Sequence, residues 1–153
     1  MALTPLTPAQ QQAVDALVAQ GRLALVPSDD ARALIFMHQA ADAIVDLPHL
    51  TKLQNRFNLA YDACHDIGEA LLAAFGYRTL VGPGQHEVIG RFLRLVIDAP
   101  PGEQDARRFD HLRRARNQQR YDARRFGEAD VALAVQTATG LFAAAVHRGV
   151  PHD

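Results

Sequence analysis

Apolar residues recur along this chain with the spacing of α-helices. They return every three or four positions, strict alternation of apolar and polar residues is absent, and β-branched residues are sparse. Alanine and leucine, both strong helix formers, fill the periodic segments. The pattern predicts an all-α protein without strands, with helices from Thr7 to near Gly21, from Ser28 to Pro48, from Phe57 to Gly76, around Val88–Val96, over 103–124 and from Gly127 to about residue 147.

Polar residues, prolines and glycines mark the ends of these helices. Thr7 followed by Pro8 is typical of a helix start, and Ser28 is the expected cap of the second helix. Gly76 is expected to end the third helix. The apolar stripes expected to face inward are Leu34, His38, Ala41 and Val45 in the second helix, Phe57, Ala60, Tyr61, Cys64, Ile67, Leu71 and Phe75 in the third, Val88, Ile89, Phe92, Leu95 and Val96 in the fourth, and Val131, Val135, Ala138, Phe142 and Ala145 in the last.

Short loops and the absence of internal repeats or low-complexity linkers indicate one domain over residues 1–153. Helices that are joined by short turns pack as antiparallel neighbours, so the expected architecture is an antiparallel bundle of five to six helices. Residues 1–27 are expected to add an accessory N-terminal helix. Residues 148–153 are expected to form a flexible tail.

Composition restricts the class of protein further. With 48% hydrophobic and 22% charged residues, the chain has the composition of a globular domain, and a net charge of −1 excludes a polyelectrolyte that binds nucleic acid through its overall charge. The abundance of arginine and alanine, against the single Lys52, is typical of a bacterial genome rich in G and C. The one cysteine, Cys64, has no partner for an internal disulfide, which favours a reducing compartment.

A cytoplasmic location is expected from the absence of targeting signals. The segment Met1–Pro5 lacks the basic start and the apolar run of a secretory signal. No stretch approaches the roughly twenty apolar residues that a membrane-spanning helix needs, so no membrane partner is expected.

Basic residues concentrate in one segment, where eight arginines lie between Arg107 and Arg125. Residues three and four apart share a face of a helix, so Arg113, Asn117 and Tyr121 form one stripe, with Arg116 and Arg120 on the stripe beside it. Forked guanidinium groups, an amide and a phenol suit a phosphate, a nucleotide or RNA. The alternative is a solvated face on which the arginines pair with neighbours such as Asp110.

The segment Leu112–Asp122, followed by a short turn and an apolar helix that ends at Leu141–Ala145, resembles the HEPN superfamily of small all-α domains. A second similar stretch runs from Asn58 to Gly76 and continues through a glycine-rich turn to Gln85–Val88. The resemblance implies a HEPN-like four-helix core. It also implies a homodimer, in which the arginine motifs of both subunits line a cleft.

Ribonucleolytic HEPN proteins carry an arginine, a polar residue and then a histidine four to six residues beyond the arginine. They cleave RNA without a metal. The resemblance assigns Arg116 as the motif arginine and Asn117 as the polar residue, but Tyr121 occupies the position of the histidine. A phenol is a poor general base at neutral pH, which weakens the prediction of an endoribonuclease toxin with a cognate antitoxin and leaves a binding function intact.

Other polar clusters have simpler interpretations. Asp62, His65, Asp66 and Glu69 share a face of the third helix, with His38 and Asp42 on the helix before it. This is half of a bundle metal site, and because the second motif is missing, we expect neither a metal nor a cofactor. Cys64 is expected to be a buried thiol. His86 is expected to cap or pack, or to border a ligand cleft, and His111 lies one turn before the arginine cluster.

Two functional hypotheses follow. The first is a HEPN-like protein of a toxin–antitoxin or stress response that binds a nucleotide or RNA through Arg116, Asn117 and Tyr121, with Arg113, Arg120, His86 and His111 as further binding residues. The second is a non-catalytic module for helical dimerisation or protein interaction, in which the same helix pairs subunits or binds an acidic partner.

Overall fold

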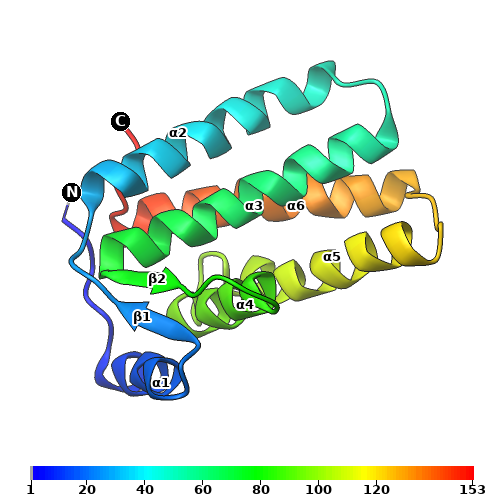
Figure 1. The fold of residues 1–153 in the computed structure, drawn as a ribbon. Coiled ribbons are helices and arrows are strands. Elements are labelled where there is room, and N and C mark those ends of the chain that lie inside the picture. Colours follow the sequence, from blue (N-terminus) through cyan, green and yellow to red (C-terminus); the bar gives the residue numbers. More distant parts are fainter. Residues whose placement is uncertain (1) are drawn as a thin grey trace.

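Four long helices lie side by side in the computed structural model, which describes residues 2–153. Figure 1 shows α2 and α3 as one antiparallel hairpin and α5 and α6 as a second, with α6 behind α3. A short helix, α4, packs against α3 and α5, and α1 crosses the end of the bundle beside α4. The bounds are α1 Pro8–Ala19, α2 Asp30–Asp46, α3 Leu53–Phe75, α4 Gln85–Val96, α5 Glu103–Tyr121 and α6 Glu128–Arg148. The expected antiparallel bundle of helices is therefore confirmed.

The center of the bundle is α3, which packs against α2, α4, α5 and α6. Its predicted apolar stripe is buried from Phe57 to Leu71, and Ala63, Ala70 and Ala74 are buried on other sides of the same helix. A helix that is buried on most sides lies inside a bundle rather than on its surface. Gly76 ends α3 in the left-handed conformation, as expected.

Two short strands depart from the prediction of a strand-free chain. Strand β1, Leu23–Leu25, pairs antiparallel with β2, Tyr77–Thr79, so that Leu23 lies opposite Thr79. Each strand has only three residues, too few to display a period of two. The pair joins the segment before α2 to the segment after α3, near the end of the bundle where α1 lies (Figure 1).

The second helix differs from the prediction in its cap and in its buried face. Its N-cap is Asp29, whose carboxylate accepts a hydrogen bond from the amide of Arg32, and not Ser28. The stripe Leu34, His38, Ala41 and Val45 is also wrong, because His38 is exposed and Val45 is 67% exposed. The buried side chains are the small or flexible Ala33, Met37, Ala40 and Ala43, and α2 packs mainly against α3. Small residues at a helix contact let the two backbones approach closely.

Two predicted ends need smaller corrections. The fifth helix stops at Tyr121 rather than at residue 124, and Ala123 follows with a positive φ of 52°. The expected flexible tail at 148–153 is wrong for its first residues. Arg148 is the last residue of α6, and Val150 is 1% exposed. A chain end that buries an apolar side chain is held against the core.

One finding bears on the expectation that no segment is apolar enough to span a membrane. Within residues 2–153, α6 is long and apolar enough to do so by length and composition. In this fold Val131, Ala138, Leu141 and Ala145 of α6 are buried in the core of the bundle. The core helix of a soluble protein meets the same criteria, so this finding is weak evidence for a membrane helix.

Candidate functional site

The middle of α5 carries polar side chains beside an inner apolar face. Ala106, Phe109 and Leu112 are buried against the bundle, and acidic residues in the first turn suit the positive end of the helix dipole. Arg113 and Arg116 follow one turn after Phe109 and Leu112 and are partly buried. The helix therefore holds these two guanidinium groups at the border between the core and solvent.

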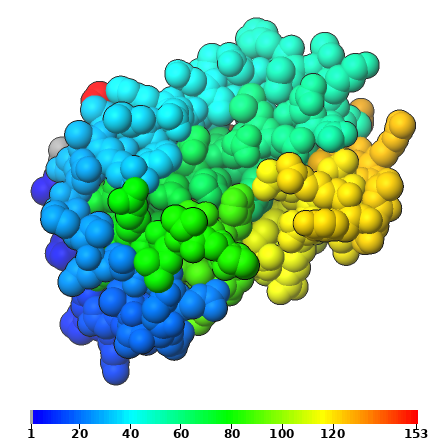
Figure 2. All heavy atoms as spheres, in the orientation of Figure 1, coloured from blue at the N-terminus to red at the C-terminus, as the bar shows by residue number. Residues whose placement is uncertain are grey.

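A cavity of about 270 Å³ lies beside these arginines. Its wall comes from α3, from the turn before α4, from α4 itself and from α5, so distant parts of the sequence meet there. Figure 2 shows on this face the green residues that follow β2 next to the yellow residues of α5, with α3 set back above them. The lining residues are Tyr61, Gly82, Gly84, Gln85, His86, Glu87, Arg113, Arg116 and Asn117.

Arg116 is the least neutralised cation of this cavity. Its guanidinium lies over the ring of Tyr61, 4.9 Å from the ring center. Within residues 2–153 no carboxylate forms an ion pair with it, and its Nε atom is buried without a hydrogen-bond partner. A buried N–H of a cation without an acceptor costs free energy, so the hydrogen-bonding capacity of this guanidinium is incompletely satisfied in the fold.

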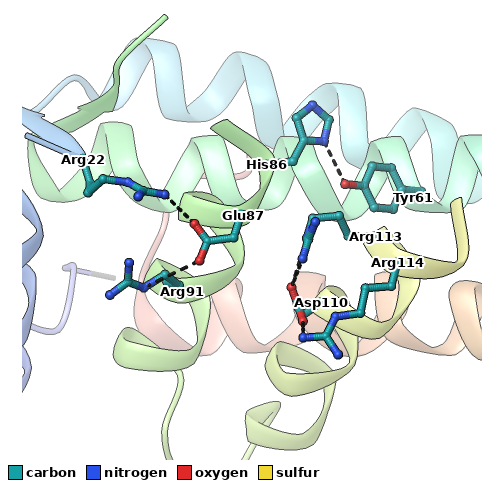
Figure 3. Close-up of polar contacts among 8 residues, drawn as sticks. All are labelled: Arg22, Tyr61, His86, Glu87, Arg91, Asp110, Arg113 and Arg114. Carbon is teal, nitrogen blue, oxygen red and sulfur yellow. Dashed lines mark hydrogen bonds and ion pairs between the residues drawn. The ribbon is translucent and has the colours of Figure 1, made fainter. Parts of the chain in front are cut away.

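Arg113 is already paired. Its Nη2 lies 2.9 Å and its Nε 3.0 Å from Oδ1 of Asp110. Arg114 contacts the other carboxylate oxygen of Asp110 at 3.0 Å, so one acid serves two arginines (Figure 3). The alternative of pairing within the helix therefore holds for Arg113 and Arg114, while a net positive charge remains on this trio.

Tyr61 and His86 form a hydrogen-bonded pair at the cavity. The hydroxyl of Tyr61 lies 2.8 Å from Nδ1 of His86 (Figure 3). Burial raises the pKa of Tyr61 to about 12, although the charges of Arg116 and Arg113 oppose this, and the phenol is therefore neutral. Burial and then the charge of Arg116 lower the pKa of His86, so its imidazole is also neutral at pH 7.

A second imidazole lies behind this pair. The ring of His65, on α3, is 4.4 Å from the ring of His86, and its Nε2 is buried without a partner. Burial, then His86 and Arg116, lower the pKa of His65 to about 4. Within residues 2–153 the cavity lining therefore combines one guanidinium without an ion pair, the paired ions Arg113 and Glu87, and neutral hydrogen-bonding groups.

Ion pairs hold the turn that closes the cavity. Gly84 has a φ of 85°, which only glycine adopts without strain, and α4 begins directly after it. Glu87 in the first turn of α4 accepts from Arg22 at 2.6 Å, and its other oxygen lies 3.8 Å from Arg91 (Figure 3). These contacts place His86, next to Glu87, against α3.

The structure brings together four of the residues proposed from the sequence and leaves three outside. Arg113, Arg116, Asn117 and His86 line the cavity. Tyr121 is 85% exposed, and Arg120 and His111 are exposed as well; none of them lines the cavity. Tyr121 lies where α5 ends, beyond the wall that Arg116 and Asn117 form.

Sequence reasoning missed Tyr61, Gln85 and Glu87 as lining residues. Tyr61 was expected only in the apolar stripe of the third helix. It does lie there and is fully buried, with its hydroxyl hydrogen-bonded to His86. A tyrosine in an apolar stripe is a signal in itself, because a buried hydroxyl needs a partner. The pattern does not reveal which partner.

The polar face of α3 is less solvated than its sequence suggests. Asp62 is exposed, but Glu69 is only 7% exposed, and burial followed by the charges of Asp62 and Glu69 raises the pKa of Asp66 to about 6. Within residues 2–153 no group of three His, Cys, Asp or Glu side chains is placed to hold a metal ion. Cys64 is buried, and burial raises the pKa of its thiol, which fits an unreactive core residue.

Comparisons with known proteins add nothing to this geometry. No protein-family model matches the chain, and neither a curated protein nor a solved structure matches it. The resemblance to the HEPN superfamily thus has no support from these comparisons and stays a prediction.

Proposed function

We propose that this protein binds the phosphate of a nucleotide or of single-stranded RNA in the cavity between α3, α4 and α5. The proposal extends the HEPN-like hypothesis drawn from Arg116 and Asn117. One observation carries it: the guanidinium of Arg116 borders the cavity with a buried Nε that has no acceptor and with no carboxylate paired to it within residues 2–153.

The neighbours of Arg116 favour an anion over a neutral ligand. Asn117 supplies an amide donor from the next position of α5. The single carboxylate of Asp110 faces both Arg113 and Arg114, so it compensates only one of their two positive charges. A forked guanidinium and an amide donate to phosphate oxygens with suitable geometry. The ring of Tyr61 beneath Arg116 restricts the orientation of the guanidinium, which reduces the entropy lost on binding.

The size and the walls of the cavity favour a single nucleotide or a flexible strand. A volume of about 270 Å³ is below the usual range of drug-sized pockets, and it holds a phosphate with adjoining groups. A duplex presents its phosphates on a wide convex surface, which a cavity of this size does not accommodate. A single strand or a mononucleotide can insert one phosphate.

The proposal is tested by titrating ATP and a short oligoadenylate RNA into the protein at low and moderate salt. We expect Arg116→Ala to weaken both ligands about 10- to 100-fold, the usual effect of losing hydrogen bonds to a charged group. Asn117→Ala should weaken them about fivefold, as for one neutral hydrogen bond. The slope of log affinity against log salt should fall by about one for Arg116→Ala, because one phosphate contact is lost.

Arg107→Ala is the matched control, because Arg107 is an exposed arginine of the same helix outside the cavity. It changes the net charge by the same amount as Arg116→Ala. If both variants weaken binding equally, or if Arg116→Ala has no effect, the cavity is not the binding site. If the wild-type protein binds neither ligand, the phosphate proposal is contradicted, and the predicted role of the helix in protein interaction becomes the better hypothesis.

A further inference from the structure

The pair Tyr61–His86 determines which ring nitrogen of His86 carries the proton. Tyr61 is fully buried, and its hydroxyl lies 2.8 Å from Nδ1 of His86. The guanidinium of Arg116 also hydrogen-bonds the phenol oxygen, but it can only donate, so it offers the hydroxyl no acceptor. A buried O–H donor that finds no acceptor costs free energy, so the phenol donates its proton to Nδ1. A neutral imidazole that accepts at Nδ1 has its own proton on Nε2.

The opposite arrangement is disfavoured by the same burial. If Nδ1–H donated to the phenol oxygen, the hydroxyl hydrogen would lack an acceptor among its neighbours. A doubly protonated imidazole would have the same defect. It would also place a second positive charge near Arg116, whose guanidinium lies over the Tyr61 ring.

The charged and titratable groups around His86 also keep it neutral. From α5, Arg116, Arg113 and Arg120 lower its pKa, and from α3 the carboxylate of Asp62 raises it while His65 contributes a neutral ring. Burial is the largest effect and lowers the pKa. Three cations against one nearby acid and the loss of solvent leave an uncharged donor.

We propose that Tyr61 holds His86 in the neutral tautomer protonated at Nε2, and that this N–H donates to a phosphoryl oxygen bound by Arg116. Nε2 has no partner within residues 2–153, is not buried, and belongs to a ring that lines the cavity. Tyr61 is then a positioning residue and His86 a ligand-binding residue. The proposal rests on phosphate binding at this cavity, as proposed above.

The tautomer separates this site from a ribonuclease site. A general base needs a lone pair on the nitrogen that faces the substrate, and Nε2–H has none. His86 therefore takes the place of a phosphate donor and does not remove a proton from a ribose 2′-hydroxyl. RNA incubated with the protein should bind and remain intact.

The tautomer is measured first, without any ligand. In the 15N-labelled protein at pH 7.5, long-range nitrogen–proton correlation spectra should show His86 as a neutral imidazole protonated at Nε2. Tyr61→Phe keeps the aromatic ring under Arg116 and removes the hydroxyl, so the preference should weaken or reverse. A wild-type imidazole protonated at Nδ1, a charged imidazolium, or a spectrum that Tyr61→Phe leaves unchanged would overturn the assignment.

The donor role is measured next, with ATP as the probe. Glutamine carries its amide N–H near the position of Nε2, whereas asparagine carries it near Nδ1. His86→Gln should therefore bind ATP within about threefold of wild type, and His86→Asn about tenfold more weakly, the effect of one hydrogen bond to a charged group. Equal losses in both variants, or no loss in either, would overturn the donor role.

The two measurements separate this inference from the proposed function. If wild-type protein fails to bind ATP or RNA, both the donor role of His86 and the proposed function are wrong. The tautomer of His86 is still decided by the nitrogen–proton spectrum alone. If binding depends on Arg116 but His86 is protonated at Nδ1, the proposed function holds and the inference alone is wrong.

Discussion

Asp66 illustrates how burial among like charges raises the pKa of a carboxyl group. It lies on α3 between Asp62 and Glu69, and desolvation together with these two acids raises its pKa to about 6. The folded state binds the proton of Asp66 more tightly than the unfolded chain does. The contribution of this proton to the free energy of unfolding is therefore complete below the unfolded pKa near 4. It is lost as the pH rises through 6.

The substitution Asp66→Asn should therefore stabilise the protein above pH 7 and have little effect near pH 4. We expect the free energy of unfolding at pH 8 to rise by about 1 kcal/mol, a value reduced from the full shift because the carboxyl is partly exposed. Urea unfolding at pH 8 and pH 4 measures this difference. Asp42→Asn, at an exposed position within α2, is the control for the loss of one carboxylate.

The residue scale also shows how far sequence reasoning reached the site. Arg113, Arg116 and Asn117 were proposed because a helix places them together, and that spacing is local. Pairing of Arg113 with Asp110 is local too, and the sequence offered it as an alternative. Tyr61 was missed because its partner His86 lies 25 positions away, which no helical period encodes.

At the scale of elements, the close approach of α4 to α3 places His86 against Tyr61. Gly68 lies in the middle of this contact. A Cβ atom at Gly68 would lie 2.5 Å from Cγ2 of Ile89, well inside a van der Waals contact. Ile89 is β-branched and has one preferred rotamer in a helix, so it cannot turn aside easily.

We predict that Gly68→Ala lowers the free energy of unfolding by about 1 kcal/mol, since overpacking costs about 1–3 kcal/mol and the gain in helix propensity returns part of it. In an Ile89→Ala background the clash is absent, and the same substitution should be neutral or stabilising. A double-mutant cycle in urea measures this reversal. Equal effects of Gly68→Ala in both backgrounds would show that the two helices are not in this contact.

Helix ends were predicted unevenly at this scale. Thr7 caps α1 with its side chain on the amide of Gln10, as expected, and Gly76 ends α3. Serine and aspartate both suit an N-cap, so the sequence did not distinguish Ser28 from Asp29. The helix begins at Asp30, which makes Asp29 the cap of α2. The short strands were missed because the paired residues Leu23 and Thr79 are separated in the sequence by the whole of α2 and α3.

At the scale of the whole molecule, Arg148 at the end of α6 forms hydrogen bonds with the N-terminal segment. Its guanidinium donates to the carbonyl oxygens of Thr4 (3.1 Å), Pro5 (3.0 Å) and Val96 (2.8 Å). It also donates to Oε1 of Gln10 on α1 at 3.0 Å. Gln10 is 5% exposed and in turn donates to Asp98 after α4 at 2.9 Å. These hydrogen bonds through Arg148 and Gln10 hold α1 against the end of the bundle.

Arg148→Met should lower the free energy of unfolding by about 2 kcal/mol, because several acceptors lose a charged donor while the apolar stem is kept. Hydrogen exchange should accelerate mainly in residues 4–20, with the central helix α3 much less affected. Arg107→Met, an exposed position on α5, is the control. Uniform loss of protection across all helices would contradict the localised role of Arg148.

The order of helices, their approximate lengths and most of their buried faces were determined by the sequence alone. These properties depend on a period of 3.6 residues and on capping side chains, both of which act within a few positions. The stripe of α2 differed most, since Ala33, Met37, Ala40 and Ala43 are buried in place of Leu34 and Val45. In α6, Val135 and Phe142 of the predicted stripe are only partly buried. Close packing between α2 and its neighbouring helices determined which residues of α2 are buried.

The cavity itself was decided only by the tertiary structure. It joins Tyr61 of α3, His86 of α4 and Arg116 of α5, which approach because three helices pack around one core. Packing also placed Tyr121 in solvent and left Arg116 without an acid within residues 2–153. Burial then kept the imidazoles and the phenol neutral, because desolvation depends on surroundings that come from the whole fold and not from the neighbours along the chain.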